Sequence, residues 1–236
     1  MAFKRHRETS RASPRKVIFD TLQKLMPADS IPALPAYSDL VKQRRSIRRF
    51  QHRAFPLELL SEVMEEVRFV PTPTNRQCYR FLGVQNPLLI ERMRLEILTR
   101  TEEIAGRLDE KSGQSFREYS QWFTFFDNAP VVLVGLFRLF SSRLPVGDPG
   151  QPPLEGVAEL QAFGGAVQTL LLSLQARGLG SCWMSGPLIA EERLLRLLHI
   201  EKPWRLGAII PVGLPDQPAA CPKKPQVSEI FGWHSQ

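Results

Sequence analysis

The residues best suited to binding an anion lie in one short run, Arg44-Arg45-Ser46-Ile47-Arg48-Arg49-Phe50. Guanidinium groups present planar forks of donors that match a phosphate or an electron-rich ring edge, and Ser46 adds a hydroxyl. We expect the apolar Ile47 and Phe50 to anchor the run to a core. A solvated basic patch or a contact to nucleic acid would have the same composition, so the run alone leaves the choice open.

A second candidate is the segment Pro71-Thr72-Pro73-Thr74-Asn75-Arg76-Gln77. Its amide side chains, Asn75 and Gln77, both donate and accept hydrogen bonds, as the edge of a uracil-like ring requires. It lies between a predicted helix and a predicted strand, where site residues concentrate. A proline-bracketed turn with Asn in a left-handed conformation is the alternative.

A third candidate is the segment Gly178-Leu179-Gly180-Ser181-Cys182-Trp183-Met184-Ser185-Gly186-Pro187. It is not a dinucleotide-binding GxGxxG, because a helix precedes it and Trp183 occupies the last position. It is not a GxSxG nucleophile elbow either. The Ser185-Gly186 step offers backbone N–H groups to a ligand, whereas a helix cap followed by an edge strand is the alternative. Further on, Pro211-Val212-Gly213-Leu214-Pro215 leads to two cations, Lys223 and Lys224.

Cysteine and histidine spacing argues against several other classes of protein. The 3 cysteines are far apart and form no CxxC, and the 4 histidines show no HxxxH or HExxH. A disulfide scaffold, a structural zinc site and a zinc hydrolase are therefore disfavoured, and we predict no bound metal. The longest apolar runs, near nine residues, fall well short of the roughly 20 that a membrane span requires.

The positive charge is concentrated at the start of the chain. Residues 1–16 contain six Lys or Arg and one Glu, a net charge of +5 out of +7 for the 236 residues. We interpret them as a solvated basic arm; an organelle transit peptide is the alternative, and no secretory h-region follows. The nearly neutral remainder argues against nucleic acid as a partner. We expect a cytoplasmic protein.

The elements that must position these residues follow from the apolar spacing. We predict a short helix at 17–26 and an extended linker at 27–35, both within a segment 17–36, and one domain over 37–236. Helical periodicity predicts helices at 56–70, 87–106, 157–177 and 191–199, and apolar runs predict strands at 79–84, 129–137, 181–184 and 206–212. This order indicates a mixed α/β domain with helices on both faces of a sheet.

Taken together, these motifs resemble the FMN-dependent nitroreductase family. The resemblance rests on RRSIRRF at 44–50, PTPTNRQ at 71–77, APVVLVG at 129–135, GLGSCW at 178–183, and PVGLP at 211–215 followed by KKP at 223–225. It implies an α+β fold with a mainly antiparallel sheet flanked by helices, in an intertwined homodimer that binds FMN at the subunit interface. It implies an FMN site formed by Arg44, Arg45, Ser46, Arg48, Asn75, Gln77, Ser185, Gly186, Lys223 and Lys224.

In that family the flavin N5 carries the chemistry, so the resemblance implies no catalytic side chain. It implies hydride transfer from NADH or NADPH to a small electron-poor acceptor such as a nitroaromatic or a quinone. We expect lid segments at 101–122 and 141–156, with Arg117, Tyr119, Trp122 and Phe123 facing the acceptor. The alternative is that Trp122, Phe123 and Phe126 are core residues of an amphipathic helix.

Three alternatives to this function stay open. The chain would be a non-catalytic flavin or nucleotide carrier, a regulatory protein, or a member of a flavin-modifying or dehalogenating branch. The iodotyrosine deiodinase branch holds its substrate with a Glu, a Tyr and a Lys on the lid. Here Glu102 and Glu103 precede Tyr119, but Lys111 comes before the tyrosine instead of after it, so the match to that branch is poor.

Overall fold

A computed structural model describes residues 33–140, 156–216 and 221–234. It divides the chain into two units, Met1–Lys42 and Gln43–Gln236. The first contains helix α2 (Ala33–Gln43), which begins within the predicted linker. Its Pro35 lies in the first turn, where proline costs a helix little, so the linker prediction is wrong from Ala33 onward. The helix predicted at 17–26 and the basic arm lie outside the described residues.

The second unit is built on one antiparallel sheet whose strands follow the order β1-β2-β4-β3. The strands are β1 (Tyr79–Val84), β2 (Val131–Arg138), β3 (Gly180–Ser181) and β4 (Trp204–Gly213). The central pair aligns Val134 with Ile209 and has a bulge between Gly135 and Leu136. β3 is shorter than predicted, because the chain turns out of the sheet after Ser181 and only Met184 pairs again, with Ile209.

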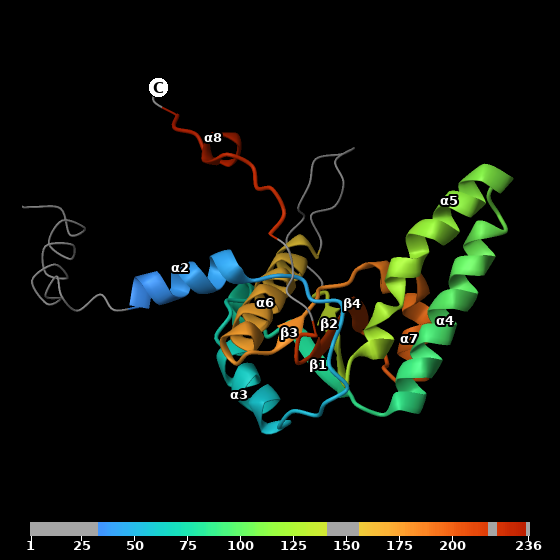
Figure 1. The fold of residues 1–236 in the computed structure, drawn as a ribbon, viewed down its shortest axis with the longest axis horizontal. Helices are drawn as coiled ribbons and strands as arrows, with labels where there is room; N and C mark the ends of the chain where they lie inside the picture. Colours follow the sequence, from blue (N-terminus) through green and yellow to red (C-terminus); the bar gives the residue numbers. More distant parts are fainter. Residues whose placement is uncertain (1–32, 141–155, 217–220, 235–236) are drawn as a thin grey trace, which may run out of the picture. The chain divides into compact units, whose positions relative to one another are not determined.

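Helices cover both faces of this sheet, as the α+β fold requires (Figure 1). One face carries α3 (Glu58–Val67) and α6 (Val157–Ala176). The other carries α4 (Pro87–Ala105), α5 (Glu110–Ser120) and α7 (Glu191–Leu197). Four short 3-10 helices, η2 (Pro73–Asn75), η3 (Gln121–Phe123), η4 (Phe125–Asn128) and η5 (Gly186–Ala190), join these elements, and α8 (Val227–Ile230) lies near the end of the chain.

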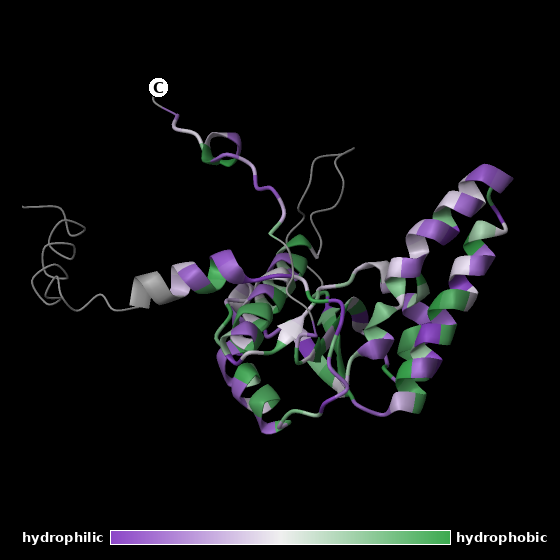
Figure 2. Ribbon diagram, in the orientation of Figure 1, coloured by the Kyte–Doolittle hydropathy of each residue, from purple (hydrophilic) through white to green (hydrophobic). Residues whose placement is uncertain are grey.

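Successive side chains of β2 are buried on opposite faces of the sheet, so each face needs a layer of helices packed against it. Leu133 and Phe137 contact the α3–α6 layer, whereas Val132, Val134 and Leu136 contact the α4–α7 layer. In Figure 2 α5 is mainly purple, whereas green segments appear both in the sheet and on the helices that pack against it.

The Phe163 ring of α6 packs closely against two glycines of the sheet. A Cβ added at Gly135 would lie 2.9 Å from the Phe163 ring, and one added at Gly207 would lie 2.5 Å from it. Both positions therefore need glycine to admit the ring. By length and composition alone α6 is long and apolar enough to cross a membrane, but 50% of its most apolar window is buried in this fold.

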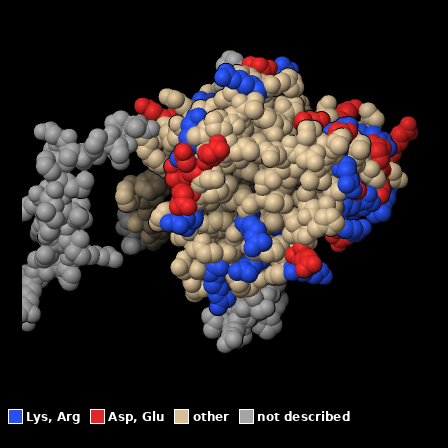
Figure 3. Space-filling model, turned by 90° about the horizontal axis from the view of Figure 1, so that it is seen from below, with Lys and Arg blue, Asp and Glu red and all other residues tan. Residues whose placement is uncertain are grey.

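Ion pairs brace the α4–α7 layer. Arg193 on α7 contacts Glu96 at 3.4 Å and also Glu103, both on α4, and Arg100 contacts Glu103 at 3.2 Å. Figure 3 shows acidic and basic side chains intermixed on this side of the molecule. The layer therefore carries little net charge despite its many arginines.

Candidate functional site

A cavity of about 800 Å³ opens beside the arginine run. It lies between the strand-like segment at 182–184, the loop that carries Arg48, and the short helices η3 and η4. The residues that line it are Arg48, Arg49, Tyr119, Trp122, Phe123, Phe125, Asn128, Cys182, Trp183, Met184 and Gly186. It combines cations with aromatic walls, and its volume is typical of small-molecule and cofactor sites.

Backbone hydrogen bonds fix the arginine run against the end of the sheet. The Ile47 N–H donates to Ser181 O at 2.9 Å, and the Asp216 N–H donates to Arg49 O at 3.1 Å. Ile47 and Phe50 are buried, as predicted. This anchoring leaves Arg48 and Arg49 exposed at the cavity.

The first half of the run borders a different, smaller cavity of about 330 Å³. Arg45 lines it with Gly178 and Ser181, and its guanidinium donates to Arg44 O at 2.8 Å. Burial raises the pKa of the Cys182 thiol, an effect opposed by Arg48, by a hydrogen bond with Ser46, and by Arg44. Cys182 lines the larger cavity and not the smaller one, and its raised pKa favours the neutral thiol there.

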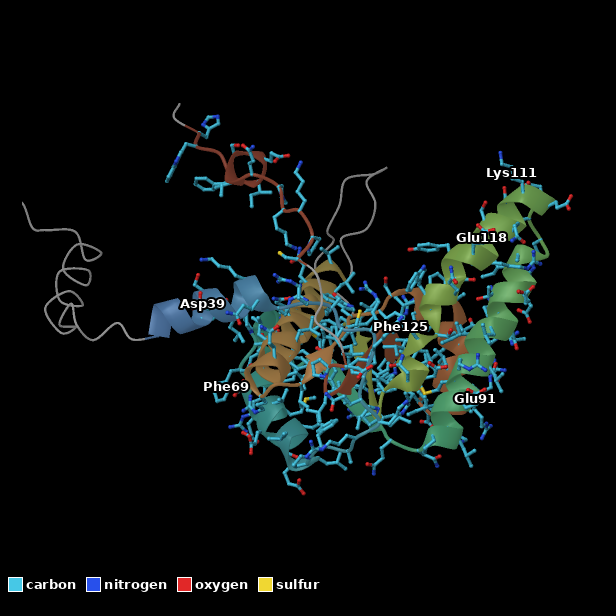
Figure 4. The ribbon with its side chains drawn as sticks, in the orientation of Figure 1. Asp39, Phe69, Glu91, Lys111, Glu118 and Phe125 are labelled. Atoms are coloured by element: carbon cyan, nitrogen blue, oxygen red, sulfur yellow. The ribbon has the colours of Figure 1, made fainter. Side chains whose placement is uncertain are left out.

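Aromatic side chains form the wall opposite the arginines. The rings of Tyr119 and Phe123 meet edge to face with centroids 5.4 Å apart. The Arg48 guanidinium lies 5.9 Å from the centroid of Phe125, which Figure 4 places at the inner end of this helical layer. A Cβ added at Gly186 would lie 2.1 Å from Phe123, so glycine at this position lets the ring pack against η5.

Asn128 is a pocket residue that the sequence did not single out. Its Nδ2 donates to Arg48 O at 3.2 Å and also to Phe125 O, so it ties the arginine run to η4. Its Oδ1 is buried and has no partner among the described residues. The signal available in the sequence was its position just before Ala129-Pro130 and the buried strand.

Two predicted site residues lie elsewhere in the chain's own fold. η2 packs against α6, and neither Asn75 nor Gln77 lines the cavity. The Gln77 side chain donates to Asn75 Oδ1 at 2.7 Å. Thr74, Asn75 and Gln77 have φ angles of 47°, 57° and 50°, so the left-handed alternative for this turn describes its backbone.

The remaining predicted residues are exposed or paired. Ser185 is exposed and its carbonyl accepts from the Leu188 N–H at 3.0 Å. Lys223 and Lys224 are exposed in the segment 221–234. Arg117 pairs with Glu102 at 2.9 Å and does not line the cavity. Figure 4 shows Lys111 at the far tip of α5, well away from Phe125. Of the predicted lid at 141–156, residues 141–155 lie outside the described part.

This set of donors suits a flat, anionic ligand such as FMN. Arg48 and Arg49 supply charge for a phosphate or an electron-rich ring edge, and the five aromatic residues that line the cavity supply faces and edges for stacking. Within the described residues, no group of three His, Cys, Asp or Glu could hold a metal ion.

Comparisons with known proteins show which sequences and folds are similar to this chain. Residues 41–214 match a model described as the Nitroreductase family. An iodotyrosine deiodinase of Thermotoga neapolitana is 30% identical over 202 residues, which are 84% of this chain and 97% of that protein.

Two solved structures are similar in fold. A BluB-like flavoprotein from Clostridium difficile has a TM-score of 0.73 at 22% identity, covering 84% of this chain and 99% of that one. An iodotyrosine deiodinase bound to FMN and 3-iodo-L-tyrosine has a TM-score of 0.64 at 25% identity, covering 84% and 98% of the two chains.

Proposed function

Because the chain belongs to the nitroreductase family, we propose that it is an FMN-dependent oxidoreductase. The observation that carries the proposal is the cavity of about 800 Å³, in which two guanidinium groups face an aromatic wall. Arg48, Arg49 and the aromatic wall would hold FMN there, and bound FMN would supply hydride-transfer chemistry. We propose no catalytic side chain.

The chain's own residues hold the cofactor and shield it. Arg48 and Arg49 neutralise its anionic or electron-rich parts, and Asn128 keeps Arg48 in place through the hydrogen bond to its carbonyl. Trp122 and Phe123 exclude water from one side and offer rings on which a planar acceptor stacks. NADH or NADPH is the proposed reductant, a small nitroaromatic or quinone the proposed acceptor, and the cytoplasm the proposed location.

We propose that a second copy of the chain completes the site. One chain has Asn75 and Gln77 on the α6 side of the sheet and not at the cavity. α6 also presents an exposed face with Val157 at 42% and Leu160 at 53% exposure, next to Gly164 and Gly165. Small residues at such a face let two helices approach closely, so this face is the proposed centre of a homodimer interface.

Reductive dehalogenation of an aromatic ring is the second candidate. It is favoured by the 30% identity to an iodotyrosine deiodinase over most of both chains. Against it, Glu102 is already paired with Arg117, and Lys111 is exposed at the tip of α5. A zwitterionic substrate would therefore need other partners in this chain.

The first experiment is the visible absorption spectrum of the purified protein, repeated without oxygen after NADH or NADPH is added. We expect a yellow protein that bleaches and regains its colour with a quinone or a nitroaromatic. Bleaching by dithionite alone, followed by iodide release from 3-iodotyrosine, would favour the dehalogenase. A colourless protein that takes up no added FMN would contradict both candidates.

The cofactor site is tested by titrating FMN into Arg48→Gln. We expect its FMN affinity to fall about tenfold or more, since a hydrogen bond to a charged group contributes roughly 1.5–3 kcal/mol. Arg53→Gln is the matched control, because Arg53 is exposed on the same loop and does not line the cavity. Equal affinities for the two variants would refute the assignment of Arg48.

A further inference from the structure

Guanidinium groups and aromatic rings alternate along one edge of the sheet. The Arg76 Cζ lies 5.1 Å from the Phe140 centroid, and the Arg138 Cζ lies 4.8 Å from the same centroid. The Arg138 Cζ is also 5.1 Å from the Trp204 centroid, and the Arg80 Cζ is 4.7 Å from it. We call these five residues the cation–aromatic ladder.

The sheet register brings the ladder together. β1 is an edge strand and contributes Arg80, while β2 contributes Arg138 opposite Trp204 at the start of β4. The Arg138 N–H donates to Cys78 O at 2.9 Å, which ties the end of β2 to the start of β1. Arg76 follows η2 and approaches the Phe140 ring from that turn.

The ladder's charge is uncompensated within the described residues. Arg76 and Arg80 are exposed, and Arg138 is half-buried with a buried Nε that has no hydrogen-bond partner. None of the three forms an ion pair with a described carboxylate, whereas the neighbouring Arg205 is paired with Glu191 at 3.0 Å. Glu159 is buried nearby and interacts electrostatically with Cys78, yet it makes no ion pair with Arg138.

The stacking of guanidinium groups on aromatic rings determines which ligands the ladder can bind. A guanidinium held over a ring keeps its in-plane N–H donors available, and its orientation is fixed before a ligand arrives. Because rings separate the three groups, they cannot converge on one phosphate. The rings already carry guanidinium groups, so they are not free platforms for bases.

We propose that the cation–aromatic ladder binds an extended polyanion through successive phosphate groups. In such a ligand the phosphate groups are part of the backbone, whereas the carboxylates of an acidic peptide lie on flexible side chains. Ordering three phosphates on binding therefore costs less entropy than ordering three carboxylate side chains. Inorganic polyphosphate and a nucleic-acid backbone share this chemistry. The small net charge of residues 17–236 argued against such a ligand. The ladder, however, concentrates at one edge three arginines that form no ion pair with a described carboxylate. The proposal does not rest on the flavin site, although Arg76 is flanked by Asn75 and Gln77, which we propose complete that site in a second copy.

The test uses the full chain and a fluorescein-labelled 15-residue oligothymidylate, followed by fluorescence anisotropy at about 50 mM salt. Arg76→Gln/Arg80→Gln is expected to bind about tenfold more weakly. The slope of log affinity against log salt should fall by about 1.4, since each phosphate contact to a single strand contributes about 0.7. Arg68→Gln is the matched control, since Arg68 also lies over a ring, 5.2 Å from the Phe69 centroid, but is paired with Glu65. Residues 1–16 are the same in every variant.

Competition identifies the source of the phosphates. Displacement of the probe by inorganic polyphosphate supports a phosphate chain of any origin, and displacement by unlabelled oligothymidylate alone supports a nucleic-acid backbone. Equal displacement by polyglutamate would overturn the phosphate assignment. No binding by the unmodified chain, or equal losses for the double variant and Arg68→Gln, would overturn the ladder as a site. Arg80→Gln alone should bind FMN with the same affinity as the unmodified chain. This result keeps the test of the ladder separate from the test of the proposed function.

Discussion

Gly186 and Phe123 illustrate how much of the cavity could be predicted from single residues. The Ser185-Gly186 step and the aromatic residues Tyr119, Trp122 and Phe123 were identified from the sequence, and all but Ser185 line the cavity. Asn128 and Trp183 were not, because an Asn before a strand and a Trp after a short one are common in any fold. What makes them site residues is a contact between distant segments, and no local pattern encodes it.

Gly186→Ala should damage the cavity from within. The added Cβ would lie 2.1 Å from Phe123, so the ring must move and the wall with it. We expect the free energy of unfolding to fall by about 1–3 kcal/mol, as in other overpacked cores, and FMN affinity to fall as well. Chemical denaturation and flavin titration measure the two effects.

Gly83→Ala is the control for this substitution. A Cβ at Gly83 would meet Leu133 at 3.7 Å, an ordinary contact. If the two variants are equally stable and bind FMN equally, the contact between Gly186 and Phe123 does not shape the site.

α3 and α6 show what periodicity predicts about elements and what it leaves out. Both helices were predicted within a few residues of their observed ends, because their apolar residues recur at helical spacing and are buried on the sheet. β3 was overpredicted, since its apolar run continues past the point where pairing stops. Periodicity is silent on polar contacts between helices, such as the pair formed by Glu66 on α3 and Arg177 on α6.

The contribution of the Glu66–Arg177 pair to the free energy of unfolding should depend on pH. A hydrogen bond from Arg177, then one from Ser173, lowers the pKa of Glu66 from its usual 4.5. The unfolded chain therefore takes up this proton first, so the stabilisation is complete above the unfolded pKa and is lost as pH falls through the folded one. Because the Glu66 side chain is 49% exposed, we expect Glu66→Gln to cost at most about 1 kcal/mol at pH 7.

Urea denaturation between pH 7 and pH 3 measures this difference. The difference in free energy of unfolding between Glu66→Gln and the unmodified chain should become smaller toward pH 3. Glu65→Gln is the control. Among the described residues the ion pair of Glu65 is with Arg68, at the end of the same helix, through side chains that are 68% and 63% exposed. A gap that stays constant over this range would exclude the ionised carboxylate as its cause.

The residues predicted to bind FMN do not all meet in a single chain, which concerns the molecule as a whole. The sequence motifs were assigned to one ligand, but within the described fold Asn75 and Gln77 do not line the cavity that Arg48 and Arg49 line. A sequence orders its motifs along one chain and does not say whether they meet in the same copy. The exposed apolar side chains of the C-terminal segment, Val227, Ile230, Phe231 and Trp233, raise the same question.

Leu160→Glu tests whether two copies share the site. Leu160 is 53% exposed on α6, and a carboxylate there would be desolvated in a helix–helix interface. We expect the variant to sediment as a monomer and to lose most of its FMN affinity, because Asn75 and Gln77 of the second copy would no longer reach the cavity. Leu88→Glu, at a leucine that is 77% exposed on α4, should change neither property. A monomeric Leu160→Glu that still binds FMN fully would show that each chain holds its cofactor alone, and a dimer unaffected by either substitution would place the interface elsewhere.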